Sequence, residues 1–156
     1  MLTSKQPLLV VLITLVLAGL GGIASAQDKN KIVAERQDAM KQQVRDLVAV
    51  RNWFQDKGEQ AAAVTGVEAA QKSVAKVPEW FPPGTGIGET SEKTRAKPEI
   101  WQQHDKFVAD DKAVLGQLAQ LEAAVKSGDK AKTEAVFGEI KFCESCHSTF
   151  RAKAEQ

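Results

Sequence analysis

Apolar side chains recur at helical spacing along most of this chain. Within residues 29–56, one stripe repeats every seven positions and consists of Val33, Met40, Leu47 and Phe54. Together with the positions between them, these residues complete a 3-4 seam, which is typical of a helix face that packs against neighbouring helices. Gly58 follows the stripe and suits the left-handed residue that often ends a helix. The pattern predicts a first helix over 29–56.

Three further helices follow from the same kind of pattern. Residues 59–77 are rich in Ala and carry a stripe of small apolar side chains, which lets a neighbouring helix approach closely. Pro98 suits the first position of a third helix over 98–126. Asp129 suits the N-cap of a fourth helix over 129–153.

A long segment between the second and third helices breaks the helical pattern. Pro78 blocks continuation of the second helix, and the connection runs on to Lys97. Trp80 and Phe81 within it predict that this loop packs onto the domain. No strand-like alternation occurs. The sequence therefore predicts an all-α fold, an antiparallel four-helix bundle with a long loop between helices two and three.

The first 26 residues have the layout of an export signal. Lys5 precedes an almost continuous apolar run over 8–20, and residues 24–26 match a small-residue cleavage site. We therefore expect residues 1–26 to be a signal peptide and residues 27–156 to form one periplasmic domain without a membrane span. The alternative is an uncleaved membrane anchor, because the charge-free run is just long enough to span a bilayer.

Composition narrows the classes of function. The chain has 156 residues, enough for one ordinary domain, and carries 21 Lys and Arg against 20 Asp and Glu. Removal of residues 1–26 takes away one lysine and no acidic residue, which leaves the charges balanced. We expect no nucleic-acid partner, because such binding draws on a large excess of Lys and Arg. Two Cys exclude a disulfide-dense scaffold and any four-cysteine metal site built from one chain.

The most specific motif places both cysteines beside a histidine, in the order Cys143-Glu-Ser-Cys146-His147. This spacing is the signature of covalent c-type haem attachment. Positions i, i+3 and i+4 share one helix face, so both thiols can reach the haem vinyl groups while His147 binds the iron. A redox-active dithiol would be expected at a helix N-terminus in a βαβ setting. A zinc site would need a fourth ligand, and the only other histidine is His104, which we expect to be an exposed helix residue.

Four motifs at fixed places in the chain are distinctive when taken together. The haem motif lies late in the chain and is followed by Phe150-Arg151. The other three are, in order, Arg36-Gln37-x-x-Met40, Phe81-Pro-Pro-Gly84-Thr85 and Pro98-Glu-Ile-Trp101. In this combination the chain resembles the cytochrome c′ family, the class II c-type cytochromes, over essentially all of residues 27–156. The resemblance implies one covalently bound haem c per chain, and family members are often dimers, so a homodimer is among the expectations.

The resemblance also implies roles for residues outside the haem motif. Met40 is expected on the distal face of the haem, where some family members place a ligating Met and others an open sixth site. Spacing agrees, because 1.5 Å per residue puts Met40 about 16 Å from the start of helix one and His147 about 9 Å from the end of the antiparallel helix four. Arg36 and Gln37 are expected to bind a haem propionate, and Arg151 is expected near the haem or the imidazole.

These features predict a periplasmic electron carrier with His147 and Met40 as the axial ligands of one haem iron, acting with redox partner proteins. If Met40 only screens the distal face, the alternative is a five-coordinate haem protein that binds nitric oxide or carbon monoxide. A further alternative is an enzyme, either a dithiol oxidoreductase or a haem peroxidase. No His or acid can be placed as a distal general acid–base catalyst, so we expect no enzyme activity.

Overall fold

The computed structural model describes residues 8–140 and 142–154. The helices in these residues are α1 (Leu8–Phe54), α2 (Gln60–Val74), the 3₁₀ helix η1 (Val77–Trp80), α3 (Glu99–Gln102), α4 (His104–Lys126), α5 (Lys130–Glu139) and α6 (Phe142–Phe150). The described residues contain no β-strand, and an isolated bridge joins Ala96 to Arg151.

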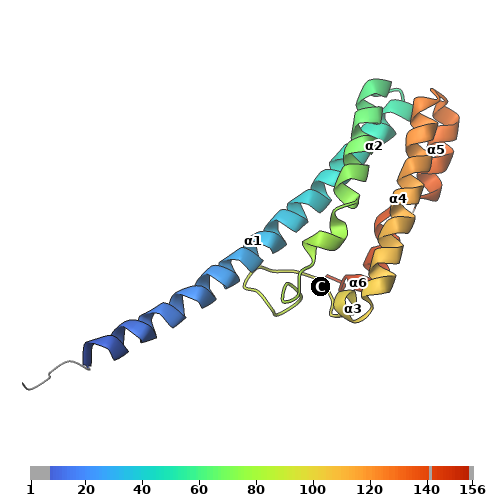
Figure 1. The fold of residues 1–156 in the computed structure, drawn as a ribbon. Coiled ribbons are helices and arrows are strands. Elements are labelled where there is room, and N and C mark those ends of the chain that lie inside the picture. The colour runs from blue at the N-terminus through green and yellow to red at the C-terminus, as the bar shows by residue number, and fades with distance from the viewer. Residues whose placement is uncertain (1–7, 141, 155–156) are drawn as a thin grey trace, which may run out of the picture.

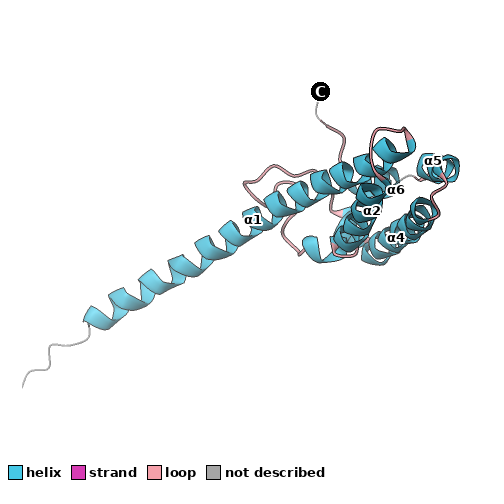
Figure 2. Ribbon diagram, turned by 90° about the horizontal axis from the view of Figure 1, so that it is seen from above, coloured by secondary structure: helices cyan, strands magenta, loops and turns pink. Residues whose placement is uncertain are grey.

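The rods of the bundle are α1, α2, α4 and the pair α5 and α6, and this all-helical packing confirms the predicted fold class (Figures 1 and 2). The C-terminal half of α1 packs against α2 and α5, while α4 packs against α2, α5 and α6, so the rods close into a ring around one core. The N-terminal half of α1 extends away from the other helices. In the part of the chain that the structure describes, no helix combines the length and apolar character needed to cross a membrane.

The first helix is longer than predicted. The apolar pattern predicts a helix at 29–56 separate from a signal peptide, whereas α1 runs without a break from Leu8 to Phe54. No proline lies within that range, so nothing interrupts the backbone hydrogen bonds between the apolar segment and the domain. Residues 1–7 of the predicted signal peptide lie outside the described residues.

The left-handed residue after α1 is Asp56, and the prediction of Gly58 was wrong. Asp56 has a φ of 59°, and the N–H groups of Asp56 and Lys57 donate to the carbonyls of Trp53 and Asn52 at 3.1 and 2.7 Å. This is the Schellman pattern, which satisfies the last carbonyls of a helix. Asp is one of the few residues besides Gly that tolerate a left-handed backbone.

The second helix and the start of the fourth largely follow the sequence. α2 ends at Val74, three residues before the predicted end at 77, and Pro78 lies in the first turn of η1. Asp129 is confirmed as the N-cap of α5, because its carboxylate accepts the Lys132 N–H at 2.9 Å.

The third and fourth predicted helices are each interrupted. Gln103, with φ −123° and ψ 44°, separates α3 from α4 within the predicted helix at 98–126. Ile140, with φ −80° and ψ 119°, ends α5, and α6 follows within the predicted helix at 129–153. Neither break falls at a proline or a glycine, so tertiary packing overrides local propensity at both. After the breaks, α3 and α6 lie at the end of the bundle where the long loop lies (Figure 1).

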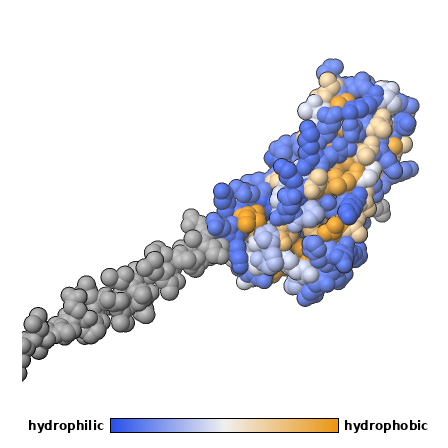
Figure 3. Space-filling view, in the orientation of Figure 1, coloured by the Kyte–Doolittle hydropathy of each residue, from blue (hydrophilic) through white to orange (hydrophobic). Residues whose placement is uncertain are grey.

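Two hydrophobic clusters build the core. The first fills the space between α1, α2 and α4 with buried residues such as Val50, Val67 and Leu118. The second contains Ile100, Phe107 and Phe150, and the loop residues Trp80 and Phe81 pack against it, as predicted. On the face shown in Figure 3, apolar side chains reach the surface in patches along the bundle, between hydrophilic residues.

Candidate functional site

The predicted haem-attachment residues lie together on α6. Cys143, Cys146 and His147 occupy positions i, i+3 and i+4 of this short helix and therefore share one face. Both cysteines are free thiols; Cys143 is exposed, and Cys146 and His147 are half-buried. The three reactive side chains are thus available from one side, as covalent attachment of a single planar group requires.

The surroundings keep both thiols protonated. Desolvation by the groups around it raises the pKa of the Cys143 thiol, although the residue reaches the surface. Burial raises the pKa of the Cys146 thiol as well, and the negative charges of Asp110 and Asp111 act in the same direction. A catalytic dithiol needs a lowered thiol pKa so that a thiolate can attack. This setting therefore gives no support to dithiol redox chemistry.

The imidazole of His147 is kept neutral. Partial burial lowers its pKa, and the positive charge of Arg95 lowers it further. The neutral imidazole carries the lone pair that binds a metal ion, so the environment suits an iron ligand. Arg95 lies in the long loop, and nothing in its local sequence distinguished it from the other loop cations.

A cavity of about 40 Å³ lies beside α6. Its walls are Gln43, Val44 and Leu47 of α1, Ala70 and Val74 of α2, Val114 and Leu118 of α4, and Cys143 of α6. All of these residues except Gln43 and Cys143 have aliphatic side chains, and Val44 stays 54% exposed. This aliphatic wall includes the Cys143 thiol, and α6 also carries Cys146 and His147 on the same face, which suits a flat apolar group bound through the two thiols. The residues present therefore fit a haem.

Helices α1 and α6 run antiparallel along this site. Cys143, at the start of α6, lines the cavity with Val44 of α1. Phe150, at the other end of α6, belongs to the cluster against which Phe81 packs. The guanidinium of Arg36 lies 4.2 Å from the centre of the Phe81 ring. This contact places the Arg36 turn of α1 beside the loop residue Phe81.

The two predicted axial ligands lie within these antiparallel segments. Met40 lies four residues after Arg36 and four before Val44, which is one helical turn from each. His147 likewise lies one turn after Cys143 on α6. Met40 is half-buried. Their pairing across one haem stays a prediction.

Arg36 is buried, with 3% exposure, and is held by the polypeptide itself. Its Nη1 donates to the Trp80 carbonyl and the Thr85 hydroxyl, both at 3.2 Å, and its Nη2 donates to the Thr85 carbonyl at 3.0 Å and the Thr94 hydroxyl at 2.9 Å. Its cation also lies over Phe81. Burial lowers the pKa of Arg36 to about 10. Pairing of Arg36 with a propionate stays a prediction, and four of the five N–H groups of its guanidinium already donate to the polypeptide.

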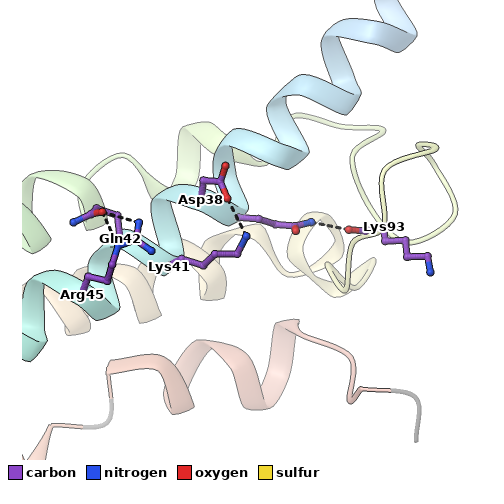
Figure 4. Close-up of polar contacts among 6 residues, drawn as sticks. Asp38, Lys41, Gln42, Arg45 and Lys93 are labelled. Atoms are coloured by element: carbon purple, nitrogen blue, oxygen red, sulfur yellow. Dashed lines mark hydrogen bonds and ion pairs between the residues drawn. The ribbon is translucent and has the colours of Figure 1, made fainter.

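Gln37, the second residue predicted to bind a propionate, also contacts the long loop. Its side-chain amide donates to the Lys93 carbonyl at 2.6 Å. Figure 4 shows this stretch of α1 with Lys93 opposite, and the exposed Asp38–Lys41 ion pair on the same side, at 2.9 Å. Gln37 and Arg36 therefore act together on one loop.

Arg151 is exposed, and its backbone pairs with the loop through the bridge to Ala96. Its N–H donates to the His147 carbonyl at 3.3 Å. Of the predicted residues, Cys143 lines the cavity, whereas Arg36, Gln37 and Arg151 contact the loop.

A buried acid that was not predicted from the sequence lies near the Cys146 thiol. Asp111 of α4 is 4% exposed, and burial raises its pKa to about 6. It lies in the apolar stripe of α4, between Phe107 and Val114. An acidic residue within an otherwise apolar stripe was the signal available in the sequence.

A zinc site finds no support in the structure. Among residues 8–140 and 142–154, no three or more His, Cys, Asp or Glu are arranged to hold a metal ion. His104 is exposed at the start of α4.

Comparison with known proteins gives consistent matches. The family model described as Cytochrome C′ matches residues 31–151. Cytochrome c′ of Cereibacter sphaeroides is 30% identical over 151 residues, covering 92% of this chain and 97% of the relative. Cytochrome c-554 of the same organism is 30% identical over 137 residues, covering 83% and 88%. A solved nitric oxide complex of a cytochrome c prime variant from Alcaligenes xylosoxidans has a TM-score of 0.68 and 26% identity, covering 80% of this chain and 97% of that one.

Proposed function

The chain belongs to the cytochrome c′ family and binds haem c covalently, and from this premise we propose that it takes up nitric oxide or carbon monoxide on the face of the haem that Met40 covers. The observation that carries the proposal is the lining of the cavity beside Cys143, in which every other residue except Gln43 is aliphatic. A neutral diatomic molecule needs no charged or acid–base partner to bind there. The nitric oxide complex of a structural relative supports the same ligand class.

The residues of α6 hold the haem. Cys143 and Cys146 would hold it covalently, each thiol adding across one vinyl group so that S–H and the vinyl double bond are replaced by a C–S and a C–H bond. His147 would bind the iron through the lone pair of its neutral imidazole. The bound haem would supply an iron that can take up a small neutral ligand.

The residues of α1 control the other face. Met40 lies one turn before Val44, and Val44 and Leu47 continue the apolar surface of α1 along the cavity. Apolar side chains there exclude water while admitting an uncharged ligand. Among the residues that line the cavity there is no His, Asp or Glu to transfer a proton, so we propose reversible binding without enzyme activity.

Two substitutions of Met40 test the proposal. Met40→Ala opens the distal side, and Met40→Leu keeps the volume while removing the thioether. If Met40 is a screen, carbon monoxide should associate with the ferrous Met40→Ala protein at least about tenfold faster than with the wild type, a change of about 1.4 kcal/mol in barrier. The Met40→Leu protein should keep the wild-type rate and spectrum. Stopped-flow mixing and absorption spectroscopy measure both.

The outcome that contradicts a screening role is equally clear. A low-spin wild-type spectrum that becomes high-spin in both variants would identify Met40 as an iron ligand. Failure of the ferrous wild-type protein to bind carbon monoxide or nitric oxide at all would end the gas-binding proposal.

Electron transfer is the second candidate, and the half-buried position of Met40, one turn from the cavity residue Val44, favours it. With the thioether as sixth ligand, the ferrous state is stabilised and the reduction potential rises, which suits exchange with redox partner proteins. The spectrum of the wild-type protein separates the two candidates, since only this one requires low-spin iron in both oxidation states.

The last part of the proposal is that the domain is exported to the periplasm. The apolar run over 8–20 and the small residues at 24–26 support cleavage after residue 26 and a periplasmic location for the domain. The intact mass of the protein recovered from the periplasm checks this, because cleavage there leaves Gln27 as the first residue.

A further inference from the structure

We propose that residues 85–97 of the long loop form a strap that sets the spacing between α1 and α6, and that Arg36 is the positioning residue that holds this strap to α1. The inference deepens the proposed function, because the strap joins the helix that carries Met40 to the helix that carries His147. Its ligand-binding readout rests on that function, whereas its structural readout does not.

Three side chains of α1 hold the first part of the strap. Arg36 donates to Thr85 and Thr94, and Gln37 donates to the Lys93 carbonyl. Asn30, two turns earlier, donates to the Ser91 hydroxyl at 2.8 Å and accepts the N–H groups of Ser91 and Glu92 at 3.1 and 3.2 Å. The contacts therefore continue along α1 from residue 30 to residue 37.

The other end of the strap is joined to the end of α6. The Lys97 N–H donates to the Phe150 carbonyl at 3.0 Å, and the Ala152 N–H donates to the Arg95 carbonyl at 2.9 Å. The Lys97 ammonium donates to the Thr149 carbonyl at 2.9 Å. These bonds flank the bridge between Ala96 and Arg151 and fix the strap to the chain segment that directly follows the haem motif.

A bond inside the strap connects its two ends. The Ile87 N–H, two residues from the Arg36 acceptor Thr85, donates to the Ala96 carbonyl at 3.0 Å. A displacement at Arg36 is therefore passed to Ala96 and from there to Arg151 through hydrogen bonds and a few peptide units.

The arrangement matters because α1 and α6 rest mainly on different neighbours. α1 packs against α2, α5 and η1, whereas α6 packs against α3 and α4. The strap is the continuous connection between them on the side of Met40 and His147. Met40 lies one turn from Arg36, and His147 lies three residues before Phe150. Both axial positions are thus close to an anchored end of the strap.

Arg36 is the anchor that other residues cannot replace. In the described part of the chain no carboxylate pairs with it, and four of its five N–H groups reach η1 and the strap. Thr85 is fully buried, so loss of Arg36 leaves the Thr85 carbonyl without this donor in a site closed to water. Lysine cannot form the same fork of parallel bonds.

The test compares Arg36→Gln with Arg45→Gln, an exposed arginine on the same helix. Hydrogen–deuterium exchange of the holoprotein should rise about tenfold for the amides of Ile87, Lys97 and Ala152 in Arg36→Gln, as expected when one or two net hydrogen bonds are lost. The amide of Val67, in the α2 core, should keep its protection. Arg45→Gln should change none of these. Arg36→Lys should stay close to Arg36→Gln, because the fork and not the charge holds the strap.

Carbon monoxide association provides the second readout. Arg36→Gln and Lys97→Met act on opposite ends of the strap, and both should change the association rate severalfold in the same direction. Faster exchange confined to residues 85–94, with Ala152 still protected, would overturn the strap. So would an unchanged association rate in both variants. If the wild-type protein binds no carbon monoxide, the proposed function fails, and the exchange at Ala152 still decides whether the strap links the two helices.

Discussion

Gly66 allows α2 to cross α1 more closely than any other residue at this position would. A Cβ added to this buried glycine would lie 2.3 Å from the Asp46 carbonyl oxygen and 3.3 Å from the Ala49 Cβ. Such a carbon is not found within 3.0 Å of a non-bonded atom, so Gly66→Ala requires the two helices to separate by about 0.7 Å. The opposing atom is backbone, so a side-chain rotation cannot relieve the contact.

Two effects of opposite sign decide the stability of Gly66→Ala. Overpacking of this kind costs about 1–3 kcal/mol. Alanine gains about 1 kcal/mol over glycine from helix propensity. We expect a net loss of about 1–2 kcal/mol in the free energy of unfolding, since the contact is with a helix backbone. Gly116→Ala in α4 is the matched control, because its added Cβ has no neighbour within 4 Å and only the propensity gain applies.

Urea unfolding of the holoprotein, followed by circular dichroism, measures both variants. The two midpoints should move in opposite directions, and the slopes should match the wild type. If Gly66→Ala proves as stable as Gly116→Ala, the close crossing of α1 and α2 is not as described, and the reasoning about this interface is refuted.

Two further substitutions test the buried acid and the helix cap. Burial raises the pKa of Asp111 from 3.8 to about 6, so the folded protein keeps a proton that the unfolded chain has lost. Stability should therefore fall as pH rises through this window, by about 2–3 kcal/mol, and stay lower above it. Asp111→Asn should abolish this fall in urea titrations at pH 4 and pH 7, and an unchanged pH dependence would contradict the assignment. Asp129→Ala removes the 2.9 Å cap of α5 and should cost about 1 kcal/mol in the same assay, whereas Asp129→Ser should lose much less.

The periodic segments of the fold were predictable because they depend on local spacing. Each rod shows its buried face as a stripe in the sequence, and the cap at Asp129 follows from residue type and position. The interruptions at Gln103 and Ile140 were not predictable, since neither residue breaks a helix by itself. They arise where α3 and α6 turn to meet the long loop, a contact between segments far apart in sequence.

The candidate site likewise contains features that depend on local sequence and features that depend on contacts between distant segments. The haem motif is local, and its spacing alone assigns three side chains to one helix face. The propionate role of Arg36 and Gln37 stays a prediction, and their contacts with Thr85 and Lys93, which lie 49 and 56 residues away, could not be predicted from local sequence. The effect of the Arg95 charge on the pKa of His147 could not be predicted either, because the proximity of the two residues depends on how the loop returns to α6.

The segment of α1 that carries Met40 is fixed on both sides by contacts of different kinds. On one side, Gly66 brings α2 against the backbone at Asp46, six residues after Met40. On the other side, Arg36 ties α1 to the strap, four residues before Met40. A helix held at two points ten residues apart has little freedom to rotate between them, because its backbone hydrogen bonds transmit any rotation to both contacts. Met40 itself then needs few contacts for its position to be defined, as the proposed role of this half-buried residue in controlling access to the iron requires.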